Sequence, residues 1–191
     1  MGKITISDLK KARKAVEKDS KFGDYIATEK NIYAKFKLNN DPALVALKIA
    51  YIDHTNSTNL RMNKLLPITM LAKEITKLNF DNRVKKGDLS LVQDIADIGN
   101  IKMLSFASKY CTYHNTQAYN RDDYSIYDSV VRSVLPSLLN EIGVNIKKSE
   151  LSNYYKYCGA IDLLIRHYQL DKIDKPRRNL DWYIWWKYRS F

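Results

Sequence analysis

Cysteine is scarce in this sequence of 191 residues, which contains only Cys111 and Cys158. Two cysteines are too few for the disulfide framework of a small secreted domain. Together with three scattered histidines they form no zinc-binding pattern, because such patterns combine closely spaced cysteine and histidine ligands. The sequence therefore predicts an intracellular, cytoplasmic protein that uses neither a metal nor another cofactor.

Long apolar stretches are also absent. No run of about 18 apolar residues occurs, and the opening GKITISDLKKARKAV is too polar for a membrane span or a secretion signal. Only 6 glycines and 4 prolines accompany a hydrophobic content of 45%. This composition argues against disorder and predicts a folded chain without a membrane partner.

Acidic residues are outnumbered by basic ones. The chain has 32 Lys and Arg against 21 Asp and Glu, which gives a net charge of +11, and its lysines are spread over nearly the whole length. Such an excess favours a polyanionic partner, with nucleic acid preferred to a membrane surface. A basic surface without any such partner is the alternative.

Helical periodicity runs through most of the chain, and only residues 3–6 alternate as a strand does. The pattern predicts an all-α fold of about eight to ten helices. We expect helix starts or caps at Ser7, Asp41 followed by Pro42, Ser90, Ser105 and Ser149, a C-terminal cap at Gly99, and a kink or restart at Pro136.

Candidate chemistry is concentrated in residues 105–135, SFASKYCTYHNTQAYNRDDYSIYDSVVRSVL. Lys109 falls in the first turns of a predicted helix, and Asp128, nineteen positions later, opens the next. An amine and a carboxylate that meet across a cleft suit nucleophilic amine chemistry. The plain alternatives are an exposed helical lysine and an N-capping aspartate. A lysine at the ordinary pKa of about 10.4 is protonated at neutral pH, so catalysis requires burial or a helix terminus to lower that value.

The segments SFASKYC and SIYDSVVRSVL resemble the region of the helix-hairpin-helix DNA glycosylases that carries the catalytic lysine and aspartate. The resemblance is strongest to the 8-oxoguanine glycosylase-like branch, and it is diffuse outside residues 104–135. The family's glycine-rich hairpin, typically Leu-Pro-Gly-x-Gly, is replaced here by MLSFAS. In the family this hairpin holds a DNA phosphate through backbone N–H groups, and Ser105 and Ser108 could take over part of that role.

The resemblance implies a two-lobed helical fold and a monomer that acts on double-stranded DNA containing a damaged base. The chain would form one compact unit, with a lobe of residues 20–140 and a second lobe of residues 1–19 plus 141–191. Lys109 would attack C1′ of an oxidised purine nucleotide, and Asp128 would stabilise the positive charge on the sugar. Strand cleavage by AP-lyase activity could follow, and the protein would associate with the nucleoid when bound to DNA.

Further DNA contacts are implied by the same resemblance. Arg132 belongs to the matched segment, and the polar loop 53–59, DHTNSTN, lies where the family contacts the minor groove. There His54, Asn56 and Asn59 would fill the gap left by a flipped base, although a simple turn with capping groups explains the loop equally well.

The C-terminal aromatic cluster of Trp182, Trp185 and Trp186 could stack a base, but packing onto the core is the more common use of such rings. Two other functions stay open from the sequence. One is a catalytically inactive nucleic-acid-binding module, and the other is a helical protein-interaction protein.

Overall fold

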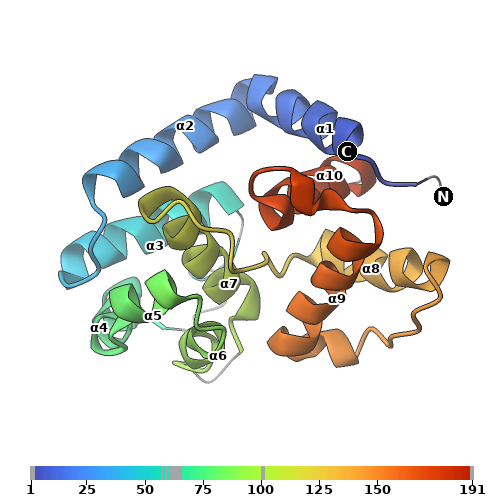
Figure 1. Ribbon diagram of the computed structural model, residues 1–191. Helices are drawn as coiled ribbons and strands as arrows, with labels where there is room; N and C mark the ends of the chain where they lie inside the picture. Colours follow the sequence, from blue (N-terminus) through green and yellow to red (C-terminus); the bar gives the residue numbers. More distant parts are fainter. Residues whose placement is uncertain (1–2, 57, 59, 61–65, 100–101, 190–191) are drawn as a thin grey trace. The chain divides into compact units, whose positions relative to one another are not determined.

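The computed structural model describes residues 3–56, 58, 60, 66–99 and 102–189, and the fold is all-α, as predicted (Figure 1). No β-strand occurs among these residues, which include the alternating segment 3–6. The helices are α1 (Ile6–Lys18), α2 (Ser20–Lys35), α3 (Pro42–Asn56), α4 (Ile68–Lys77), α5 (Phe80–Lys86), α6 (Ser90–Ala96), α7 (Leu104–Tyr113), α8 (Ser129–Glu141), α9 (Tyr154–His167) and α10 (Pro176–Tyr188). A π-helical turn, His114–Ala118, follows α7, and 3₁₀ turns occupy Glu150–Ser152 and Leu170–Lys172.

The chain divides into two compact units. The terminal unit contains residues 1–26 and 125–191, and the central unit contains residues 27–124. These boundaries differ from the expected 20 and 140, because α8 packs on α9 and α10 and so belongs with the chain ends. Helix α2 contributes its first residues, up to Ile26, to the terminal unit and the rest to the central unit.

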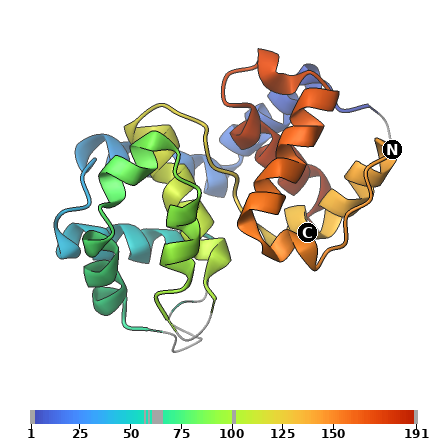
Figure 2. The ribbon, with the colours of Figure 1, turned by 60° about the horizontal axis from the view of Figure 1, so that its bottom comes forward.

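The terminal unit joins the two ends of the chain. Helix α1 lies along α10, and α10 also packs against α8 and α9 (Figure 1 and Figure 2). Leu9, Ala12 and Val16 form the buried face of α1. Its N-cap is Thr5 and not the expected Ser7: the Thr5 side chain accepts from the Asp8 N–H, and the Asp8 carboxylate accepts from the Thr5 N–H.

The central unit is built around α7. Every residue of this helix except Ser105 is buried, and α7 packs against α3 and α6. Helix α3 begins at Pro42, and the Asp41 carboxylate accepts a hydrogen bond of 2.8 Å from the Ala43 N–H, so the predicted start is confirmed.

Several other predicted boundaries are wrong by a few residues. Helix α6 ends at Ala96 with Asp97 as its C-cap, not at Gly99. Pro136 lies within α8, which continues on both sides of it. Asn153, not Ser149, caps α9 through a side chain that accepts from the Lys156 N–H. No helix in the described part of the chain is long and apolar enough to cross a membrane.

Candidate active site on helix α7

Lys109 is a buried lysine. It is only 6% exposed on the central helix of its unit, and its Nζ donates to Ser105 Oγ at 3.3 Å. Among the described residues the other buried lysine and arginine side chains are Lys48 and Arg178. An exposed surface lysine, the plain alternative offered by the sequence, is therefore wrong. Burial of an ammonium group is costly unless hydrogen bonds compensate for the lost water, and Ser105 supplies one of these bonds.

Polar groups line the Lys109 face of α7. Ser105, Lys109 and Tyr113 follow one another at intervals of four residues, which puts them on one face of the helix. The Tyr113 hydroxyl donates to Asn56 Oδ1 at 2.7 Å. Asn56 is the last residue of α3. The central unit thus connects the end of α3, where base-contacting residues were predicted, to the helix that carries the lysine.

The predicted loop 53–59 begins later than expected. Helix α3 continues through Asn56, so His54 and Asn56 lie in its last turn and not in a loop. His54 is exposed, Asn56 is half-buried, and Asn59 lies outside the described residues. Residues 53–56 contain neither glycine nor proline to stop the helix, and Asp53 accepts hydrogen bonds from Thr58 Oγ1 and the Leu60 N–H just beyond it.

The MLSFAS segment, residues 103–108, forms the N-cap and first part of α7. Met103 is the N-cap residue and Leu104 begins the helix, and both are buried. Ser108 has no exposed surface and donates to the Ser105 carbonyl at 3.0 Å. Ser108 is therefore not accessible to a phosphate, contrary to prediction, whereas Ser105 is half-buried.

Asp128 lies in the terminal unit and is the N-cap of α8. Its half-buried carboxylate accepts a 2.7 Å hydrogen bond from the Val130 N–H, which confirms the predicted capping role. One turn later, Arg132 donates to the Tyr127 hydroxyl at 2.9 Å, with its guanidinium carbon 5.4 Å from the centre of that ring. Since Lys109 belongs to the central unit, the structure does not bring it together with Asp128 inside one unit.

A second buried lysine, Lys48, was not predicted. Its Nζ lies 3.0 Å from the Leu38 carbonyl, 3.2 Å from Asn39 Oδ1 and 3.1 Å from His114 Nε2. Three acceptors match the three protons of an ammonium group, so this lysine is fully used in joining α3 to the end of α7. The signal was visible in the sequence, because Lys48 is the one charged residue of the apolar run ALVALKIAYI.

His114 completes this buried network. Its Nδ1 lies 3.0 Å from the Tyr110 carbonyl, which only accepts, so Nδ1 carries the proton and Nε2 accepts from Lys48. Burial lowers the pKa of Lys48 to about 8. Burial, followed by the charge of Lys48, lowers the pKa of His114 well below its ordinary value of 6.5. The histidine is therefore neutral in the folded protein at neutral pH.

The network predicts a loss of stability in mild acid. Below pH 6.5 the unfolded chain takes up a proton on His114 that the folded chain excludes, so the free energy of unfolding falls as the pH falls. The expected loss is about 2 kcal/mol between pH 7 and pH 5. Chemical denaturation at both pH values should show this loss in the wild-type protein and a smaller one in His114→Gln. The same exchange at the exposed His167 is the control, and an equal pH dependence in both variants would rule out this origin.

In the described part of the chain, no group of three or more His, Cys, Asp or Glu side chains could hold a metal ion.

The family match found by comparison with known proteins contains Lys109 but not Asp128. Residues 8–121 match the model of a family described as HI_0787_N, N-terminal domain. This segment begins within α1 and includes α2 to α7, and thus Lys109, and it ends before Asp128. An uncharacterized protein of Haemophilus influenzae (strain ATCC 51907 / DSM 11121 / KW20 / Rd) is 32% identical over 145 residues, which cover 70% of this chain and 64% of that protein. No solved structure matches the chain.

Proposed function

The chain belongs to the HI_0787_N N-terminal domain family, and we propose that it is a DNA base-excision enzyme, a glycosylase with AP-lyase activity that uses Lys109 as its nucleophile. The substrate is duplex DNA containing an oxidised purine such as 8-oxoguanine. The observation that carries this proposal is the burial of the Lys109 amine on the central helix of its unit, at 6% exposure.

Burial is what an amine nucleophile requires. A lysine attacks only as the neutral amine, and an apolar environment favours that form over the ammonium. Phe106 and Tyr110, close to Lys109 on α7, are themselves almost fully buried. Ser105 Oγ keeps one hydrogen bond to Nζ and so directs the side chain along the helix.

The proposed reaction begins when Nζ of Lys109 attacks C1′ of the damaged nucleotide. The bond between C1′ and the base breaks, and the base leaves with the electron pair and takes up a proton. Opening of the sugar ring gives an imine between Nζ and C1′, and β-elimination then breaks the 3′ C–O bond. Water finally releases the lysine. In this scheme the carboxylate that stabilises the positive charge developing on the sugar is Asp128, the N-cap of α8.

Binding to DNA is supported by the charge of +11 and by the exposed His54 at the end of α3. Each phosphate neutralised by the protein releases counterions, so affinity for duplex DNA should fall steeply with salt. For about four to six phosphate contacts, the slope of log K against log salt should be about −4 to −5. Fluorescence anisotropy with a labelled duplex measures this slope, and absence of binding at low salt would favour the protein-interaction function instead.

The direct test of the proposal is release of a damaged base. The protein is incubated with a duplex that contains one 8-oxoguanine, and the free base and the cut strand are measured over time. An undamaged duplex is the control. The second candidate, an inactive DNA-binding module, is favoured by the helical MLSFAS segment, in which Ser108 is buried and no glycine hairpin is formed. It predicts salt-dependent binding without release of any base.

A further inference from the structure

Helix α1 carries a stripe of three exposed lysines, Lys10, Lys14 and Lys18, which we call the lysine stripe. The three residues follow one another at intervals of four, so their side chains lie on one face of the helix. The buried face of α1, which contains Leu9 and Val16, lies on the other side, where α1 packs against α10. The lysine stripe therefore faces away from the core of the terminal unit.

Both acidic residues of α1 are engaged with other groups. The Asp8 carboxylate accepts from the Thr5 N–H at 3.0 Å and from Thr5 Oγ1 at 2.6 Å as part of the helix cap, and Glu17 pairs with Arg13 at 2.9 Å. The ammonium groups of the lysine stripe form no ion pair or hydrogen bond with another residue that the structure describes. Repulsion between like charges four residues apart, which destabilises a helix, is therefore left in place along the stripe.

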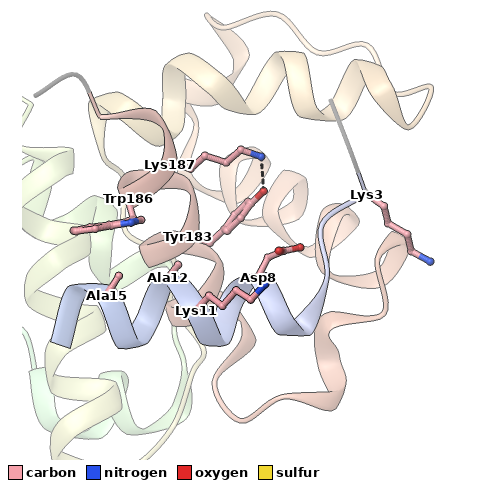
Figure 3. Close-up of a pocket in the computed structure, with 8 residues that line it drawn as sticks. All are labelled: Lys3, Asp8, Lys11, Ala12, Ala15, Tyr183, Trp186 and Lys187. Atoms are coloured by element: carbon pink, nitrogen blue, oxygen red, sulfur yellow. Dashed lines mark hydrogen bonds between the residues drawn. The ribbon is translucent and has the colours of Figure 1, made fainter. Parts of the chain in front are cut away.

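Lys11 differs from the lysines of the stripe because it lies near a carboxylate. Together with Asp8 it lines a pocket between α1 and α10, and Figure 3 shows its amine near Asp8. The hydrogen bond from the Thr5 side chain is the main cause that lowers the pKa of Asp8, and the charge of Lys11 lowers this pKa further. The charge of Lys11 is thus partly balanced within the unit, which is why we leave it out of the stripe.

The surroundings of the stripe favour nucleic acid over a membrane surface as its partner. Helices that bind to membranes combine basic residues with an apolar face that enters the bilayer. In α1 the apolar face of Leu9, Ala12 and Val16 is buried in the terminal unit, where α1 packs against α10. Helix α1 can therefore offer a polyanion its charge but no apolar anchor.

The same stripe favours a duplex over a single strand. Proteins that hold single-stranded nucleic acid stack the exposed bases on aromatic rings, and α1, with the sequence ISDLKKARKAVEK, contains no aromatic residue. Residues four positions apart in a helix are separated by about 6 Å along its axis, so the stripe presents its three charges at fixed spacing. Fixed charges suit the regularly spaced phosphates of a duplex, which position a protein without carrying sequence information.

We propose that the lysine stripe binds the phosphate backbone of duplex DNA, with one phosphate contacted by each of Lys10, Lys14 and Lys18. The contacts are electrostatic and independent of sequence. They supply three of the about four to six phosphate contacts expected for the whole protein. The inference places a DNA-binding surface in the terminal unit, outside the proposed site on α7. It shares with the proposed function the partner, duplex DNA, but it does not depend on the chemistry of Lys109.

Fluorescence anisotropy with a labelled, undamaged duplex tests this proposal, because a duplex without a lesion reports binding and not chemistry. The wild-type protein is compared over a series of salt concentrations with a triple variant that combines Lys10→Gln, Lys14→Gln and Lys18→Gln. Loss of three phosphate contacts should reduce the magnitude of the salt slope by about 2.7, since each contact contributes about 0.9. All three exchanges are at exposed positions and remove like charges, so the variant should fold, which circular dichroism verifies.

The matched control exchanges three other exposed lysines of the terminal unit for glutamine, namely Lys147, Lys148 and Lys172. It makes the same change in net charge outside α1 and should leave the salt slope almost unchanged. An unchanged slope in the α1 variant, or an equal reduction in both triple variants, would overturn the proposal. Vesicles of phosphatidylcholine and phosphatidylserine are the second probe. Binding to vesicles that the α1 variant loses, without an effect on duplex binding, would assign the stripe to membranes instead.

The outcomes of this test are distinct from those of the proposed enzyme. A reduced slope in the α1 variant, together with no base release by the wild-type protein, would support the lysine stripe and contradict the glycosylase. Base release by the wild-type protein, together with an unchanged slope in the α1 variant, would do the reverse.

Discussion

Exchange of Lys109 for glutamine is expected to abolish strand cleavage and to reduce base release at least about 10³-fold, because removal of a nucleophile costs at least this much in enzymes that depend on one. Glutamine retains a polar end that can still contact Ser105 Oγ, and it removes the need to bury an amine. The variant should therefore fold, which a cooperative thermal transition verifies. Single-turnover assays on a lesion-containing duplex measure the effect.

Lys102→Gln is the matched control for this exchange. Lys102 is exposed immediately before α7 and carries the same charge, so its loss changes the interaction with DNA but not the chemistry. Both variants lose one of 32 basic residues, and each should change the salt slope of duplex binding by about 0.9 at most. A wild-type rate in Lys109→Gln, or an equal loss in both variants, would assign Lys109 a role other than nucleophile.

Asp128→Asn is expected to leave the fold intact and to slow base release about 10²–10³-fold. Asparagine caps helices about as well as aspartate, so its Oδ1 should still accept from the Val130 N–H at the start of α8. The exchange removes only the negative charge. Electrostatic stabilisation of a charge that develops in the transition state is worth about 3–4 kcal/mol, which corresponds to this loss in rate. The rate is measured at saturating enzyme, so that chemistry and not binding is followed.

Asp41→Asn is the matched control for Asp128→Asn, because it removes the charge of a capping aspartate outside the proposed site. Asp41 is also an aspartate that accepts from the backbone two residues later, at 2.8 Å, but it opens α3. Its exchange should change stability by the same small amount as Asp128→Asn and leave the rate of base release unaltered. Similar rates for the two variants would show that Asp128 serves only as a cap.

Local signals in the sequence predicted much of the fold. Asp41 and Pro42 both act within the first turn of α3, so the sequence alone determines this start. The predicted cap at Ser7 is wrong for an equally local reason. Thr5 has an acidic residue three positions later, Asp8, and forms a reciprocal capping box, whereas the residue three positions after Ser7 is a lysine. The acidic residue three positions after Thr5 is therefore the local feature that places the cap there.

The burial of individual side chains could not be predicted from local signals, because it depends on how the helices pack against one another. Helix α7 is buried on almost all sides, since α3 and α6 pack against it, and this packing encloses Lys109 and Ser108 alike. The sequence alone predicts that Ser108 is available to a phosphate, and its plain alternative for Lys109 is an exposed helical lysine. The pairing of Lys48 with His114 is likewise a contact between residues 66 positions apart, which no local pattern reveals.

Covalent trapping tests the central claim most directly. Borohydride reduces an imine to a stable amine, so it should fix a protein–DNA adduct on a duplex that contains 8-oxoguanine, but not on an undamaged duplex. Digestion and mass spectrometry should locate the attached sugar at Lys109, and Lys109→Gln should give no adduct while Lys102→Gln gives the wild-type amount. An adduct at another residue, undiminished trapping in Lys109→Gln, or base release with no adduct at all would contradict the proposed role of Lys109 as the nucleophile.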